Sequence, residues 1–148
     1  MIMESLKEIQ DQLSSFKEYN CIIILCKYNG GKSSLITDMI HQFFGEDKTY
    51  YLTFVDQSKN NFTPRKSRLK FNELVKRKIV IFDEIDDEEK RDVKPYLKKL
   101  IENNLVIILS NLYGSSNDSE KEIRLFKEQE KDILPVNTLF IFVKQQEN

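Results

Sequence analysis

The apolar residues of the chain follow two different patterns. Between residues 5 and 19 they recur at spacings of three and four, which predicts an amphipathic helix with Leu6, Ile9, Leu13 and Phe16 on its buried face. Farther along, they form short continuous runs, which are typical of strands buried on both faces of a parallel sheet. The predicted strands are CIIILC (21–26), TYYLTFVD (49–56), KIVIFDEID (78–86), LVIILSN (105–111) and VNTLFIFVK (136–144).

Helical patterns separate these strands. A helix over 33–44 is expected to end near Gly45, because glycine commonly terminates helices. Further helices are predicted over 68–77, 87–104 and 119–131. Buried strands that alternate with helices predict an α/β fold, a three-layer α/β/α sandwich around a mainly parallel five-stranded sheet.

The length and composition of the chain indicate one ordered domain. Its 148 residues are enough for a single core, with residues 1–19 as an N-terminal helix and residues 20–144 as the core itself. The net charge of −1 gives no overall attraction to nucleic acid or anionic lipid. No apolar run approaches the roughly 20 residues that span a bilayer, and no signal peptide is evident, so we expect a cytoplasmic protein without membrane association.

The two cysteines are not expected to form a disulfide with each other. Cys21 and Cys26 are five positions apart on a predicted strand, and an odd spacing places their side chains on opposite faces. No other cluster of cysteine and histidine suggests a zinc site.

The segment CKYNGGKSS (26–34) joins the first predicted strand to a helix, which is the setting of a phosphate-binding loop. Gly30 and Gly31 let the backbone approach a phosphate, whose charge faces the N–H groups of the helix start. Lys32 is expected to neutralise the β- and γ-phosphates, Ser33 to bind Mg²⁺, and Ser34 to contact the α-phosphate. A Gly-Gly turn before an ordinary helix is the alternative. The predicted nucleotide-binding residues are Asn29, Gly30, Gly31, Lys32, Ser33 and Ser34.

Two other predicted strands end in polar residues. The third strand leads into Asp83 and Glu84, and the fourth leads into Ser110 and Asn111. Ligands bind at the carboxyl ends of parallel strands, so these side chains are expected near the phosphate loop. The alternatives are a solvated acidic turn and a polar strand end before a glycine turn.

Together, the three segments resemble the motifs of P-loop NTPases of the additional-strand (ASCE) class. The similar proteins are AAA+ proteins, superfamily 3 replication helicases and DNA-packaging ATPases of viruses and plasmids. Lys32 and Ser33 match the central residues of the loop motif, and Gly31 matches the glycine before them. Cys26 departs from the motif, which has glycine at its first position.

The resemblance implies a division of roles and a topology. Asp83 holds Mg²⁺ through water, alongside Ser33, and Glu84 polarises the attacking water. The amide of Asn111 hydrogen-bonds the γ-phosphate or that water. The implied catalytic residues are therefore Glu84, Lys32 and Asn111, with ATP and Mg²⁺ as substrate and cofactor. The implied strand order is 5-1-4-3-2, numbered along the chain.

The chain resembles only a minimal core of these proteins. AAA+ proteins usually add a helical lid after the sheet, whereas this sequence ends at Asn148. Superfamily 3 helicases carry a β-hairpin between the acidic motif and the sensor, and the segment 90–104 leaves little room for it. Such cores usually form homo-oligomers in which a neighbour supplies an arginine finger. The candidate fingers are Arg124 and Arg91, and a solvated helix charge is the alternative for each.

Positive charge is concentrated between Lys59 and Lys78, a segment with eight basic residues and only one acidic residue. Aromatic residues are interleaved with the basic ones. Such a segment can follow a phosphate backbone and stack on bases. A solvated loop is the alternative. The candidate nucleic-acid contacts are Arg65, Lys66, Arg68 and Lys70.

The sequence therefore favours an ATP-hydrolysing enzyme that acts on nucleic acid as an oligomer, such as a helicase-like or packaging-motor core. Two alternatives stay open. One is a nucleotide-dependent switch or assembly factor with little turnover, and the other is a small-molecule kinase. No guanine-recognition signature is evident, which favours ATP over GTP.

Overall fold

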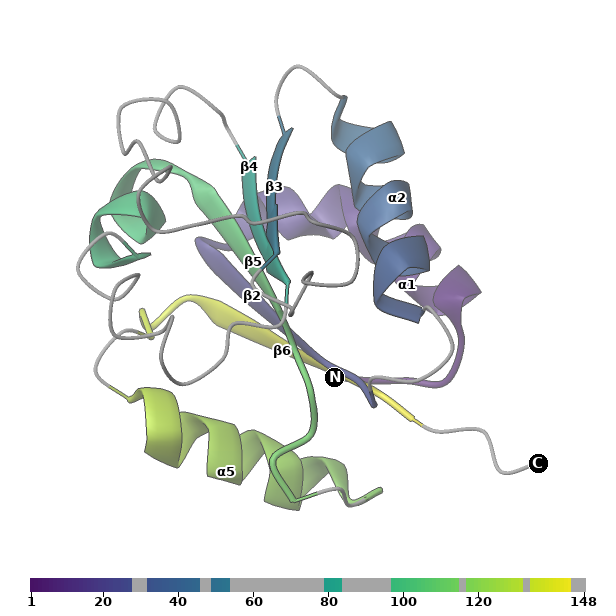
Figure 1. The fold of residues 1–148 in the computed structure, drawn as a ribbon, viewed down its shortest axis with the longest axis vertical. Coiled ribbons are helices and arrows are strands. Elements are labelled where there is room, and N and C mark those ends of the chain that lie inside the picture. Colours follow the sequence, from purple (N-terminus) through teal and green to yellow (C-terminus); the bar gives the residue numbers. More distant parts are fainter. Residues whose placement is uncertain are drawn as a thin grey trace, which may run out of the picture.

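A parallel sheet forms the centre of the molecule (Figure 1). In the computed structural model, which describes residues 1–27, 32–45, 49–53, 79–83, 97–114, 117–131 and 134–144, six strands pair into this one sheet, and every pairing is parallel. Along the sheet the order is β1-β6-β2-β5-β4-β3. The strands are β1 (Ile2–Met3), β2 (Cys21–Leu25), β3 (Thr49–Thr53), β4 (Ile79–Asp83), β5 (Leu105–Ser110) and β6 (Thr138–Val143).

The predicted strand order needs one correction, because the sheet has an edge strand that the pattern did not predict. β1 lies beyond β6, so the order differs from 5-1-4-3-2 by one added strand, while the five predicted strands keep the expected neighbours. Contacts with a distant segment hold β1 in place: the N–H of Phe142 donates to the Met1 carbonyl at 3.1 Å, and that of Lys144 donates to the Met3 carbonyl at 2.8 Å. Two residues carry no periodicity, so only this pairing defines the strand.

The helix predicted over residues 5–19 divides into two elements. These are α1 (Leu6–Gln12) and the 3₁₀ helix η1 (Leu13–Glu18). The Ser15 hydroxyl donates to the Gln12 carbonyl at 2.7 Å, a local bond of the kind that competes with α-helical pairing. The predicted buried face is nevertheless correct at three positions, because Ile9, Leu13 and Phe16 are all buried.

The remaining helices follow the predicted spans closely. α2 (Lys32–Phe44) ends at Gly45, whose φ of 97° lies in the left-handed region that favours glycine. α5 (Ser119–Glu130) begins at Asp118, whose carboxylate accepts the N–H groups of Glu120 and Lys121. Residues 97–103 are helical as well, within the predicted helix over 87–104. The predicted helix over 68–77 lies outside the described residues.

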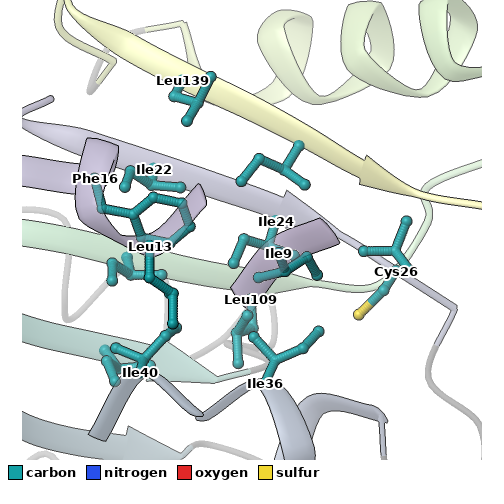
Figure 2. Close-up of a cluster of buried hydrophobic side chains, with 14 of the residues drawn as sticks. Ile9, Leu13, Phe16, Ile22, Ile24, Cys26, Ile36, Ile40, Leu109 and Leu139 are labelled. Carbon is teal, nitrogen blue, oxygen red and sulfur yellow. The ribbon is translucent and has the colours of Figure 1, made fainter. Parts of the chain in front are cut away.

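Helices cover both faces of the sheet, which gives the three-layer arrangement (Figure 1). α1, η1 and α2 pack on one face, and the helix over 97–103 and α5 pack on the other. β2 shows the alternation: Ile22 and Ile24 face α2, whereas Cys21, Ile23 and Leu25 face the opposite cluster. Figure 2 shows the α2 side of this core, in which Ile36 and Ile40 of the helix lie against the strands.

Two further expectations concern the cysteines and the membrane. Cys21 and Cys26 are both buried, neither forms a disulfide, and they belong to clusters on opposite faces, as predicted. None of the helices in the described part of the chain combines the length and the apolar character that crossing a bilayer requires.

Burial of Cys21 leads to a pH-dependent stability. Burial raises the pKa of the Cys21 thiol from its usual value to about 12, because the thiolate would lose its hydration. In the unfolded chain the thiol ionises near pH 8.5, so the folded state binds more protons between these two values. The free energy of unfolding is therefore expected to fall with rising pH in this window, by up to ~1.4 kcal/mol per pH unit.

Urea unfolding at pH 8 and at pH 10.5, under reducing conditions, tests this expectation. The Cys21→Ala variant lacks the thiol but keeps every other titrating group, so it should lose less stability between the two pH values than the unchanged protein. Equal losses in the two proteins would contradict the assignment.

The carboxyl edge of the sheet as a candidate nucleotide site

The carboxyl ends of three central strands lie side by side at one edge of the sheet. In the β2–β5 pair Leu25 is opposite Ser110, and in the β4–β5 pair Asp83 is opposite Leu109. The last residue of β3, Thr53, is opposite Asp83 in turn. The ends of β2, β4 and β5 therefore differ by no more than about one residue in height, and the residues that follow them emerge at the same edge.

α2 begins at this edge. Figure 2 shows Ile36 beside Leu109 toward the arrowheads of the strands, and Ile40 farther back along them. The helix therefore runs opposite to the strands, with its first residue, Lys32, at the carboxyl edge. The first turn of a helix has backbone N–H groups without intrahelical partners, so this end favours an anion.

The loop residues themselves are only partly described. Lys32, Ser33 and Ser34 occupy the first turn of α2, and their placement is described for the backbone alone. Asn29, Gly30 and Gly31 lie outside the described residues. The structure thus shows the strand before the loop and the helix after it.

Cys26, which stands where the loop motif has glycine, belongs to the core. Its side chain is 1% exposed and packs in the cluster beneath α2 that contains Ile24 and Ile36 (Figure 2). Its N–H donates to the Ser110 carbonyl at 3.1 Å, so the pairing of β2 with β5 continues one residue beyond the strand. The thiol at position 26 thus fills a space in the apolar core at the point where β2 ends.

Asn111 lies at the end of β5 with its carboxamide oriented by the backbone. Its Oδ1 accepts the N–H of Leu112 at 2.9 Å, and the Ser110 hydroxyl donates to the Asn111 carbonyl at 3.0 Å. Asn111 is exposed, whereas Leu112 is buried. The carboxamide of Asn111 is therefore oriented by its bond to the backbone of the segment that follows β5.

Asp83 ends β4, and its position follows the register of that strand. Ile79 and Ile81 belong to the cluster that α2 covers, and position 83 continues the same series by two residues. Glu84 lies outside the described residues. Among the residues that the structure describes, no group of three His, Cys, Asp or Glu side chains could hold a metal ion.

The other predicted contacts divide between α5 and segments outside the description. Arg124 is exposed on α5, which packs on the face of the sheet opposite α2. Lys32 and Arg124 of one chain are therefore on different sides of the sheet. The candidates outside the described residues are Arg91, Arg65, Lys66, Arg68 and Lys70.

Two buried acidic residues on α5 escaped the sequence interpretation. Glu122 and Glu130 are both buried and lie four residues on either side of the buried Phe126. That spacing places all three on one helix face, which was the available signal, but a glutamate is normally expected in solvent. Both carboxylates accept hydrogen bonds from the segment that follows β5.

Comparison with known proteins adds no assignment: no protein-family model matches the chain, and no curated protein matches it.

Replacing Cys26 with glycine would restore the motif but is expected to destabilise the fold. Cys26→Gly removes a buried side chain and adds backbone freedom to the unfolded chain, so the free energy of unfolding should fall by about 1–3 kcal/mol. Denaturant unfolding measures this free energy. Cys26→Ala keeps the Cβ, so its stability should lie between those of the unchanged protein and Cys26→Gly. An unchanged stability of Cys26→Gly would show that the thiol does not fill the core.

Proposed function

We propose that this chain is an ATP-binding and hydrolysing P-loop NTPase of the additional-strand class. One observation carries the proposal: β5 lies between β2, which leads into the GGKSS segment, and β4, which ends in Asp83. In this arrangement the phosphate loop and the acidic strand end are one strand apart, and the strand between them ends in the polar pair Ser110 and Asn111. This is the order that the three motifs require if they serve one triphosphate.

The start of α2 supports the binding half of the proposal. The triphosphate lies at the N-terminus of the helix, where backbone N–H groups and Lys32 balance its charge. Ser33 and Asp83 hold Mg²⁺, which neutralises negative charge on the phosphate oxygens. Position 83 is in the face register that α2 covers, so these two ligands are on the same side of the sheet.

The hydrolysis half depends on residues at the ends of β4 and β5. Glu84, which directly follows β4, orients the attacking water, and the oriented amide of Asn111 donates to the γ-phosphate. Phosphoryl transfer needs positioning and charge stabilisation rather than covalent chemistry from the protein. A rigid sheet edge that carries Asp83 and Asn111 meets this requirement.

Substitutions at the loop lysine and at the acidic strand end test the reaction. Lys32→Ala is expected to abolish ATP binding and hydrolysis, whereas Glu84→Gln should retain binding and lower kcat about 10²-fold or more. Phosphate release and binding of a fluorescent ATP analogue measure the two effects. Lys17→Ala removes an exposed lysine of η1 as a matched control and should leave both unchanged.

The same assays separate the alternatives, when they are run with and without single-stranded DNA. Equal turnover in Lys32→Ala and the unchanged protein would contradict the proposal. Saturable ATP binding without turnover, even with DNA, would favour the switch. Transfer of the γ-phosphate to a nucleoside would favour the kinase.

Action as an oligomer has a separate test in Arg124. Because α5 and α2 cover opposite faces, we assign Arg124 to the phosphate site of a neighbouring subunit rather than to that of its own chain. Arg124→Ala is expected to lower kcat about 10³-fold, and mixing it with Lys32→Ala should restore part of the activity. The restored sites pair an intact loop with an intact arginine. If mixing the two variants restores no activity, Arg124 is not the arginine finger.

A further inference from the structure

The segment after β5 is anchored to α5 at Gly114. Its backbone nitrogen lies 3.0 Å from both Oε1 and Oε2 of Glu122, so both carboxylate oxygens accept the same N–H. A Cβ at position 114 would lie 2.9 Å from Glu122 Oε1 and 3.0 Å from Cδ1 of Leu125. A larger residue at position 114 would therefore displace the end of the Glu122 or Leu125 side chain. The backbone after β5 and the side chain of Glu122 lie in close contact.

Burial of Glu122 calls for a physical explanation. The residue is 1% exposed, and a buried carboxylate loses its hydration. The bond from Gly114 and the position of Glu122 in the first turn of α5 both offset this loss, because a helix N-terminus favours negative charge. An apolar side chain would pack at this position without that loss, but it could not accept the N–H of Gly114.

A second anchor lies one residue earlier. The ring of Tyr113 stacks on Phe126 of α5, with centroids 5.5 Å apart and planes at 14°, and its hydroxyl donates to Glu130 Oε1 at 3.3 Å. Phe126 in turn makes an edge contact with Phe140 of β6. Tyr113 and Gly114 are thus both held by the buried face of α5.

These anchors continue to Asn111. Leu112 is buried in the same cluster as Phe126, and its N–H donates to Asn111 Oδ1 at 2.9 Å. Every residue from 111 to 114 is therefore fixed by a contact. The N–H of Leu112, which orients the Asn111 carboxamide, belongs to the same backbone segment as Gly114, which is bonded to Glu122.

We propose that Glu122 is a positioning residue. By holding Gly114, it fixes the segment after β5 and, through that segment, the carboxamide of Asn111. The role in catalysis rests on the proposed function, whereas the positioning itself does not. Catalytic groups have to be held within about 0.5 Å of the productive geometry, and a displacement of 1 Å can lower a rate about 10²-fold.

Amide hydrogen exchange tests the positioning without ATP. In Glu122→Gln one acceptor oxygen is replaced by a donor, so exchange at Gly114 should accelerate about tenfold or more, as expected for a weakened bond to a charged acceptor. Exchange at Leu112 should rise as well, because its amide bonds to Asn111. Ile23, in the central strand β2, reports the change in global stability, so exchange at Gly114 and Leu112 should accelerate more than exchange at Ile23. Faster exchange at Gly114 with no change at Leu112 would overturn the proposal.

Glu128→Gln is the matched control for this experiment. It makes the same chemical change at an exposed position of the same helix, so exchange at both amides should stay as in the unchanged protein. Tyr113→Phe keeps the ring stack and removes only the bond to Glu130, and it supplies a milder variant if Glu122→Gln does not fold. Its Leu112 exchange should rise severalfold, and no rise would count against the anchoring.

Kinetics test whether the positioning acts through Asn111. Glu122→Gln should lower kcat about tenfold with little change in KM, and it should have no further effect in an Asn111→Ala background. Full additivity of the two substitutions would overturn the link. If the unchanged protein has no ATPase activity but Leu112 still responds to Glu122→Gln, the proposed function fails and the positioning stands.

Discussion

The parallel pairing of β5 with both β2 and β4 is the constraint on which the candidate site depends. Parallel strands cannot be joined by tight turns, so the chain crosses a face of the sheet between one strand and the next. α2 makes such a crossing between β2 and β3, and it begins where β2 ends. Strand ends and helix starts are thereby brought to one edge. Residues 32, 83 and 111, far apart in sequence, have their backbones at this same edge because of the direction of the strands.

The edge is held in position by the core on either side of it. Ile22, Ile23 and Ile24 are fully buried, alternately on the two faces, and each such side chain contributes about 1.5–3 kcal/mol through burial. Cys26 extends this packing to the first residue beyond β2. The backbone at the end of β2 is therefore fixed by core contacts, which is the preorganisation that the proposed phosphate chemistry requires.

The two faces of the sheet differ in how they are filled. The described packing beneath α2 is almost wholly apolar, whereas α5 brings the carboxylates of Glu122 and Glu130 into the interior. Polar groups inside a core specify one arrangement only when their bonding is satisfied, and here both accept from the turn after β5. A local conflict between residue type and environment is a common mark of functional constraint. Here the buried carboxylate of Glu122 is bonded to Gly114, three residues after Asn111 of the proposed site.

The sequence by itself determined the positions of five of the six described strands and the polar residues that follow them, because a continuous apolar run and a GGKSS or FDE sequence are local properties. It also located the buried face of the first helix and the ends of α2 and α5. The order of neighbours came from the family resemblance. Only the tertiary structure decided that Ile2–Met3 joins the sheet, that Cys26 fills the core and that Glu122 is buried, because each depends on a partner distant in sequence or a neighbouring element, which no periodicity records.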